Sequence, residues 1–278
     1  MSVTAASAQQ GAQQAGETFD AGHLIMHHIV DSREIVIPLY GPITLPRWEM
    51  AGYDVSITRS VVMMWLAGAI LLVFFGLASR RAKEPVPRGL RNFLEVLVLY
   101  IRDEVARKTI PHHADRFVPY LLTCFFFILT CNLIGLVPGM STATGCISVT
   151  ATLAAFTFLL AQASGVREYG FVGHFRNLVP RGLPIAILPI MIPVEILSLF
   201  TKPFALAVRL FANMTAGHAV ILSLVSIIFI MKSALWAGMS VPFALFVYGL
   251  EILVSFLQAF IFTMLSSLFI GMAVHSAH

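Results

Sequence analysis

Five stretches of this sequence run for about twenty residues or more with almost no charged side chain. The first, residues 60–79, holds no Asp, Glu, Lys or Arg at all. A helix of about twenty apolar residues spans the roughly 30 Å hydrocarbon core of a bilayer. Only 12% of the 278 residues are charged, which is about half the share in a soluble domain. The sequence therefore predicts an all-α polytopic membrane protein and excludes a soluble enzyme or a disulfide-rich secreted module.

The predicted helices form a single membrane domain over residues 23–278, preceded by a polar tail over residues 1–22. Membrane helices are expected at residues 60–79, 117–137, 143–163, 187–230 and 235–274. Amphipathic helices on the membrane surface are expected at residues 89–109 and near the N-terminus. The N-terminal stretch contains His23, His27 and His28, but no carboxylate or further histidine completes a ligand set, so we expect no metal there.

The net charge of +4 arises from loops that flank the apolar runs rather than from a nucleic-acid-binding surface. Five cations follow the first span within twelve residues, and three more follow the third span: Arg80, Arg81, Lys83, Arg88 and Arg91, then Arg167, Arg176 and Arg181. Short cytoplasmic loops are enriched in Lys and Arg. We therefore expect a membrane protein whose N-terminus lies outside and whose C-terminus lies in the cytoplasm.

The last two apolar runs are too long for ordinary spans. Residues 187–230 would form a helix of about 66 Å and residues 235–274 one of about 60 Å, roughly twice the hydrocarbon thickness. Each run is long enough for two spans, but the first contains no polar turn, only Pro193 and Pro203. We favour two continuous, strongly tilted helices in an antiparallel hairpin, because their polar residues align only in that arrangement.

One face of the 187–230 helix is small and polar. At about 100° per residue, Glu195, Ser198 and Asn213 lie within about 40° of Arg209. Small residues occupy the rest of this face: Ala205, Ala212, Ala216 and Ser223. Small residues let another helix approach closely. This small-residue face is either a seam inside the chain's own bundle or a docking surface for a partner subunit, and we favour the partner.

Arg209 is the reason for that preference. An arginine keeps its charge at any accessible pH and costs roughly 2.5–3.5 kcal/mol at the centre of a membrane helix unless it is paired. Glu195 lies about 21 Å away along the helix, and the only other carboxylate inside an apolar run is Glu251. The predicted counter-charge is a carboxylate of another subunit, ionised beside Arg209 and protonated when it faces lipid.

Residues equidistant from the turn of a helical hairpin lie at the same height. With the turn near residue 234, the predicted levels pair His218 with Glu251, Asn213 with Ser255, and Arg209 with Gln258. His218 lies on the face opposite Arg209, so His218 and Glu251 form a separate pair. Side chains of both types can titrate near physiological pH when partly buried, which suits a proton relay. A static hydrogen-bonded pair is the alternative.

At these residues the chain resembles the a subunit of rotary proton-translocating ATP synthases, the membrane stator of that motor. The likeness extends over roughly residues 20–275 and rests on four segments of the apolar part: Phe117-Val118-Pro119-Tyr120 through Asn132-Leu133-Ile134-Gly135, Leu199-Phe200-Thr201-Lys202-Pro203, Arg209-Leu210-Phe211-Ala212-Asn213 through Gly217-His218, and Leu257-Gln258-Ala259-Phe260. A fifth segment, His27-His28-Ile29-Val30-Asp31-Ser32, resembles the N-terminal segment of the bacterial form, which implies a bacterial inner-membrane protein. At Ala212 many members of that family have glycine, which we interpret as a mild packing change.

The resemblance implies that Arg209 faces the carboxylates of a rotor ring of c subunits and blocks leakage between two offset half-channels. It implies an uptake half-channel lined by His218, Glu251, Gln258, Asn213 and Asn132, and an exit near Glu195 and Ser198. The implied partners are the c-ring, b-type peripheral-stalk subunits and the rest of the synthase. The implied role is non-catalytic and needs no cofactor.

An ion-coupled secondary transporter is the alternative, since it too places charged residues at the membrane midplane. Such a transporter usually carries an internal repeat and helices broken by glycine or proline, and we find no convincing repeat. A freestanding cation channel is disfavoured because the unpaired Arg209 would repel cations from its pore.

Overall fold

The computed structural model describes residues 34–37, 41–44, 49–50, 53–54, 56–80, 89–110, 113–137, 140–177, 188–231 and 234–274. The predicted polar tail, the predicted N-terminal amphipathic helix and the three N-terminal histidines lie outside these ranges. Two short antiparallel hairpins come first: β1 (Glu34–Ile37) pairs with β2 (Gly41–Thr44), and β3 (Glu49–Met50) pairs with β4 (Tyr53–Asp54). The sequence analysis did not predict these strands.

Helices make up the rest of the secondary structure in the described ranges, which confirms the predicted fold class. In chain order they are α3 (Arg59–Arg80), α4 (Leu90–Tyr100), the π-helix η1 (Ile101–Ala106), α5 (Arg107–Thr109), α6 (Ala114–Gly135), the 3₁₀ turn η2 (Ala143–Gly145), α7 (Ile147–Asn177), α8 (Leu188–Met231) and α9 (Ala234–Val274). Among the described residues, five helices are long and apolar enough to cross a bilayer: α3, α6, α7, α8 and α9.

The observed α7 differs from the predicted span over residues 143–163. It begins later because residues 143–145 form η2, where the Oγ1 of Thr142 accepts a 2.8 Å hydrogen bond from the backbone N–H of Gly145. It continues further because Arg167 and Glu168 are exposed, so their charges do not need to end the helix. At Gly170 the backbone leaves the helical region with φ 71°, a conformation that favours glycine.

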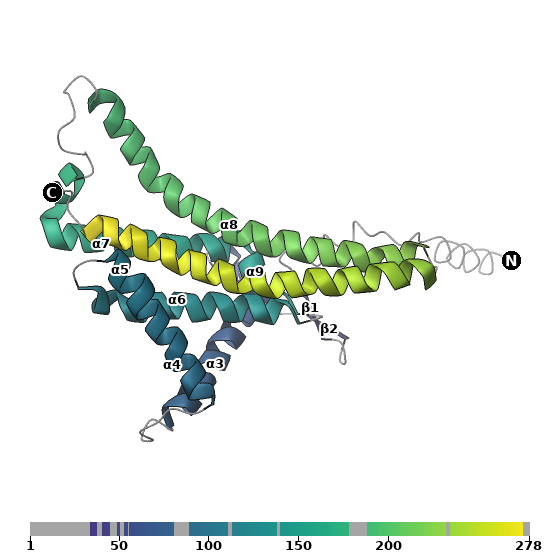
Figure 1. Ribbon diagram of the computed structural model, residues 1–278. Coiled ribbons are helices and arrows are strands. Elements are labelled where there is room, and N and C mark those ends of the chain that lie inside the picture. The colour runs from purple at the N-terminus through teal and green to yellow at the C-terminus, as the bar shows by residue number, and fades with distance from the viewer. Residues whose placement is uncertain are drawn as a thin grey trace.

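Both α8 and α9 are single continuous helices, which confirms the predicted hairpin and excludes the division of each run into two spans. The 44 residues of α8 continue through Pro193 and Pro203, and α9 continues through Pro242. The two helices run side by side and antiparallel, and the N-terminal part of α8 diverges from α9 (Figure 1). The steep tilt to the membrane stays a prediction that follows from helix lengths of about 60 Å or more.

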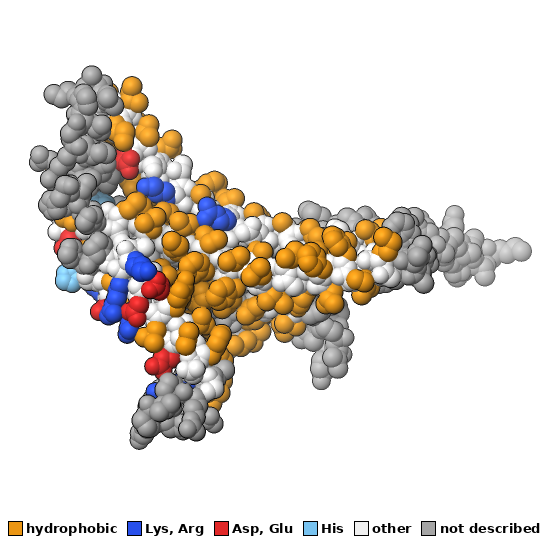
Figure 2. Space-filling view, viewed as in Figure 1, with side chains coloured by type: hydrophobic (Ala, Val, Ile, Leu, Met, Phe, Trp, Pro, Cys, Tyr) orange, Lys and Arg blue, Asp and Glu red, His pale blue; other side chains and the backbone are white. Residues whose placement is uncertain are grey.

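The apolar core lies between α6 and α9. Leu121, Phe125 and Ile128 of α6 and Phe262 of α9 are at most 1% exposed. In contrast, large apolar side chains such as Leu72 of α3 are exposed on the outside, and hydrophobic side chains cover much of the visible face over α8 and α9 (Figure 2). Such extended apolar surface suits contact with lipid or with another subunit.

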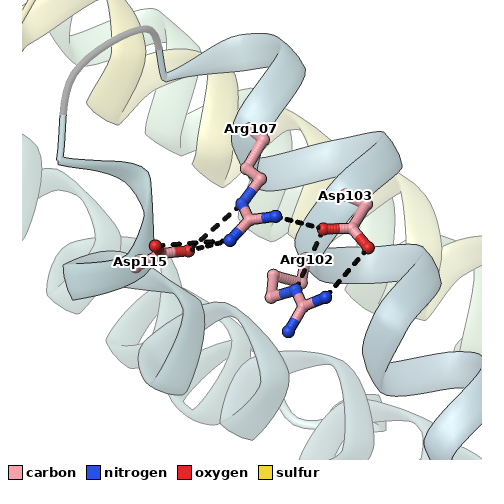
Figure 3. Close-up of polar contacts among 4 residues, drawn as sticks. All are labelled: Arg102, Asp103, Arg107 and Asp115. Carbon is pink, nitrogen blue, oxygen red and sulfur yellow. Dashed lines mark hydrogen bonds and ion pairs between the residues drawn. The ribbon is translucent and has the colours of Figure 1, made fainter.

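The segment α4, η1 and α5 corresponds to the predicted amphipathic helix at residues 89–109. Arg107 anchors it to α6, because its guanidinium contacts Asp103 at 2.8 Å and Asp115 at 3.0 Å (Figure 3). The end of the segment packs on α9, where a Cβ at Gly271 would lie 2.1 Å from the carbonyl oxygen of Thr109. We refer to residues 89–110 as the interfacial segment.

Candidate functional site

His218 of α8 and Glu251 of α9 lie together, as their equal heights predicted. The Nδ1 atom of His218 is 3.0 Å from Oε1 of Glu251, whose side chain is only 3% exposed. Gly217 makes room for this carboxylate, because a Cβ there would lie 2.4 Å from the same oxygen. The acid is therefore held directly against the backbone of α8.

The imidazole of His218 also contacts two backbone carbonyl groups. Its Nε2 lies 2.8 Å from the oxygen of Gly135, the last residue of α6, and its Nδ1 lies 3.0 Å from the oxygen of Met214. Carbonyl oxygens only accept hydrogen bonds, so both contacts are hydrogen bonds only when both ring nitrogens carry a proton. The arrangement suits an imidazolium with Glu251 as its counter-charge.

Glu251 has no comparable set of donors. Within the described ranges, neither of its carboxylate oxygens accepts a directed hydrogen bond. The reason is that Nδ1–H of His218 points to the Met214 oxygen and meets Oε1 only as a close charge contact. A buried carboxylate without donors gains from taking up a proton or a water molecule. The pair of Glu251 and His218 therefore has the chemistry to accept and release protons.

The second side-chain contact between α8 and α9 corrects the predicted pairing. Nδ2 of Asn213 donates to Oε1 of Gln258 at 2.7 Å, whereas equal heights paired Asn213 with Ser255 and Arg209 with Gln258. Side chains lean toward the N-terminus of their own helix. On antiparallel helices, Asn213 therefore leans away from the turn while Gln258 leans toward it, and the two side chains meet between their Cα heights.

Asn132 of α6 connects this polar layer to two further elements. It is fully buried, its Nδ2 donates to the backbone oxygen of Ser255 at 3.3 Å, and its Oδ1 accepts from Oγ1 of Thr144 in η2 at 2.6 Å. Nearby, the hydroxyl of Tyr248 donates to the backbone oxygen of Leu136 at 2.7 Å. The end of α6 is thus held against α9 beside His218, and Thr144 is a member of the layer that the sequence analysis missed.

Arg209 lies apart from these contacts. Its side chain is exposed, while its neighbours Leu206 and Leu210 are buried in the bundle. No carboxylate of the described residues lies within 4.0 Å of its guanidinium. The small-residue face around it is exposed at Ala205, Ala212, Ala216 and Ser223. This exposure excludes a seam inside the chain's own bundle and leaves the face open.

Glu195 lies at a second polar site, a cavity of about 140 Å³ between α7, α8 and α9. Glu195 and Lys202 of α8 line this cavity together with Gln162 and His174 of α7. The sequence analysis missed Gln162, which lies at the end of the predicted span over residues 143–163, and His174, which lies beyond that span among the arginines expected on the cytoplasmic side. The glycine at position 170 was the available signal that the chain reverses there.

Ser198, the other residue predicted near the exit, lies one turn from Glu195 on α8 and is partly exposed. Its backbone oxygen accepts a 3.2 Å hydrogen bond from Oγ1 of Thr201. Ser198 is not among the cavity-lining residues that the structure describes.

Comparison with known proteins relates this geometry to a family. Residues 61–271 match the family model described as ATP synthase A chain. ATP synthase subunit a of Chloroherpeton thalassium is 55% identical over 258 residues, which cover 91% of this chain and 77% of that protein. This chain belongs to the ATP synthase subunit a family. ATP synthase subunit a 2 of Prosthecochloris aestuarii is 52% identical over 280 residues, which cover 99% of this chain and 86% of that protein.

All eight predicted site residues fall inside the segment that matches the subunit a family model. The relatives are bacterial subunit a proteins, as the sequence resemblance indicated. The alternative prediction, an ion-coupled secondary transporter, was supported only by the charged residues expected at the membrane midplane. Membership of the subunit a family accounts for those residues without it.

Proposed function

We propose that this chain is the non-catalytic stator subunit a of a bacterial rotary ATP synthase. In this proposal it carries protons through two offset half-channels at its interface with a rotor ring of c subunits, and so couples the proton gradient to ATP synthesis. Its further partners are b-type peripheral-stalk subunits and the rest of the synthase, in the inner membrane. The names of the relatives support the synthase assignment, and the finer roles rest on the physical arguments that follow.

The observation that carries the proposal is the exposed guanidinium of Arg209 within a membrane helix. A permanent charge there is unfavourable unless an anion neutralises it. The described residues offer no such anion, and the exposed small-residue face admits a close helix. A rotor carboxylate that is ionised at Arg209 and protonated elsewhere meets this need. The same cation repels protons, so it separates the two half-channels.

On the uptake side, we assign the proton route to His218, Glu251, Gln258, Asn213 and Asn132. The contact between His218 and Glu251 and the bond between Asn213 and Gln258 support a continuous polar layer across α8 and α9. Polar side chains inside a bilayer are expensive and usually mark an ion route. This layer lies at the end of α6 that faces outside in the predicted orientation.

On the exit side, we assign Glu195 and Ser198 to the route that releases protons to the cytoplasm. Glu195 supports this role because it lines a cavity near the ends of α7 and α9. In the predicted orientation, with the N-terminus outside and the C-terminus cytoplasmic, these ends lie on the cytoplasmic side. The arginines that follow α3 and those in and after α7 support that orientation.

The test is Arg209→Ala in the assembled synthase, with Arg167→Ala of α7 as the matched control, because Arg167 is also exposed. We expect the Arg209 variant to assemble and to hydrolyse ATP but to lose proton-driven ATP synthesis in reconstituted vesicles. The control should keep synthesis. If the Arg209 variant still couples a proton gradient to synthesis, the proposed function of this arginine is wrong.

A further inference from the structure

The cavity beside Glu195 contains a histidine that the function described so far does not use. His174 is only 3% exposed, and its Nε2 lies 2.7 Å from Oε1 of Gln162. Because an amide oxygen only accepts hydrogen bonds, Nε2 carries a proton in this contact.

The local backbone is shaped to hold this ring. The positive φ at Gly170 reverses the chain, so His174 returns to the helical turn that carries Gln162. Gly165 accommodates the imidazole, because a Cβ there would lie 2.3 Å from Nδ1 of His174. Two glycines and one amide therefore fix a buried imidazole at the wall of the cavity.

Two other ionisable groups line the cavity from the elements around it. Glu195 and Lys202 come from α8, whereas α9 contributes Phe269, Met272 and Ala273, none of which titrates. Glutamate and lysine ordinarily titrate near pH 4 and pH 10, and histidine near pH 6.5. Among the described lining residues, His174 is thus the group whose type changes charge near neutral pH. A cavity of about 140 Å³ is large enough for several water molecules.

We propose that His174 is a further proton-carrying residue of the exit route, positioned by Gln162. A proton that leaves Glu195 crosses the cavity through water to the imidazole of His174, and the imidazolium then releases a proton to water on the cytoplasmic side. Glu195 loses one proton and the cytoplasm gains one, so the step is balanced. The proposal rests on the proposed exit role of Glu195 and adds a second carrier to it.

The test measures proton flux through the reconstituted synthase while only the pH on the cytoplasmic face is varied. We expect the wild-type flux to change with a midpoint near neutral pH. His174→Gln keeps a polar side chain but cannot titrate, and we expect it to remove this midpoint and to slow flux by about tenfold or more. His113→Gln, at an exposed histidine before α6, is the matched control and should keep the wild-type profile.

Gln162→Glu provides a second measurement that needs no loss of the histidine. An added carboxylate beside the ring favours its charged form, so the midpoint should move to higher pH by about one unit or more. A purely structural histidine would give no such shift. The proposal is overturned if Gln162→Glu leaves the midpoint unchanged, or if an assembled His174→Gln synthase keeps the wild-type profile. If the Glu195→Gln synthase keeps the wild-type proton flux, the proposed exit role of Glu195 is wrong. If Glu195→Gln slows the flux but His174→Gln keeps the wild-type pH profile, only the role of His174 is rejected.

Discussion

Oε1 of Glu251 lies 3.0 Å from Nδ1 of His218, and the same imidazole reaches the last carbonyl group of α6 through Nε2 at 2.8 Å. One titratable ring therefore joins α6, α8 and α9. The ring meets a buried carboxylate on one side and backbone acceptors on the other. Such a junction can change its proton content only if the surrounding groups accommodate both the neutral and the charged ring.

The first prediction concerns exchange of the two partners. We expect His218→Ala and Glu251→Ala each to slow proton flux by about a hundredfold, because each removes a proton-carrying group. The double variant His218→Glu with Glu251→His keeps one acid and one imidazole at the same contact and should recover most of the loss. Flux through the reconstituted synthase is the measurement. A swap as damaging as the single replacements would contradict a relay and favour a static pair.

Gly217→Ala should impair proton flux with little effect on stability. The new Cβ would lie 2.4 Å from Oε1 of Glu251, which is the end of a flexible side chain and can move. The carboxylate would then leave His218 while the bundle remains packed. Gly249→Ala is the control, because its added Cβ would meet nothing within 4 Å beyond its chain neighbours and the backbone of its own helix. Flux and thermal unfolding of both variants would be compared, and an active Gly217 variant would show that this contact is dispensable.

Gly271→Ala should instead destabilise the protein. Its Cβ would lie 2.1 Å from the oxygen and 3.0 Å from the carbon of the Thr109 carbonyl group, and backbone cannot move aside as a side chain can. We expect a loss of about 1–3 kcal/mol in the free energy of unfolding and faster hydrogen exchange in the interfacial segment. Gly238→Ala, also in α9 but with open space around its Cβ, should leave both measurements unchanged.

The ion pairs within the interfacial segment should weaken in acid. The Arg102 guanidinium, 2.9 Å and 3.1 Å from the carboxylate of Asp103, holds the pKa of that carboxyl below its usual value, and Arg107 adds to the effect. Because the pKa of this carboxyl is lower in the folded state than in the unfolded state, ionised Asp103 stabilises the fold at pH values above its unfolded-state pKa, near 4. That stability is lost as the pH falls through the folded-state pKa. We expect the hydrogen-exchange protection factors over η1 to fall below about pH 4.

Asp103→Asn is the control for this acid effect. It removes the titrating group, so the protection factors over η1 should no longer change with pH in that range. The effect should be small, because these side chains are exposed and water screens the contact. An equal acid response in the Asp103 variant would assign the weakening to another carboxyl group, such as Asp115 (Figure 3).

Much of the candidate site was predictable because it depends on helical periodicity alone. Arg209 and the small residues around it share a face whatever surrounds the helix, and the structure confirms that this face is exposed. The equal heights of His218 and Glu251 could be predicted from the position of the hairpin turn alone. The partners of Gln258 were predicted wrongly, because they depend on the direction in which side chains lean on facing helices.

The order, lengths and apolar faces of the membrane helices were determined by the sequence itself, because hydrocarbon thickness and the need to satisfy every backbone group leave few alternatives. The tertiary structure decided which distant groups meet. It brought the end of α6 to His218, joined Asn213 to Gln258, and returned His174 to a cavity beside Glu195. These contacts depend on side-chain direction and on close approaches at Gly217 and Gly165, which are set by the packing of several helices at once. Only the chain reversal before His174 has a local signal, the glycine at position 170.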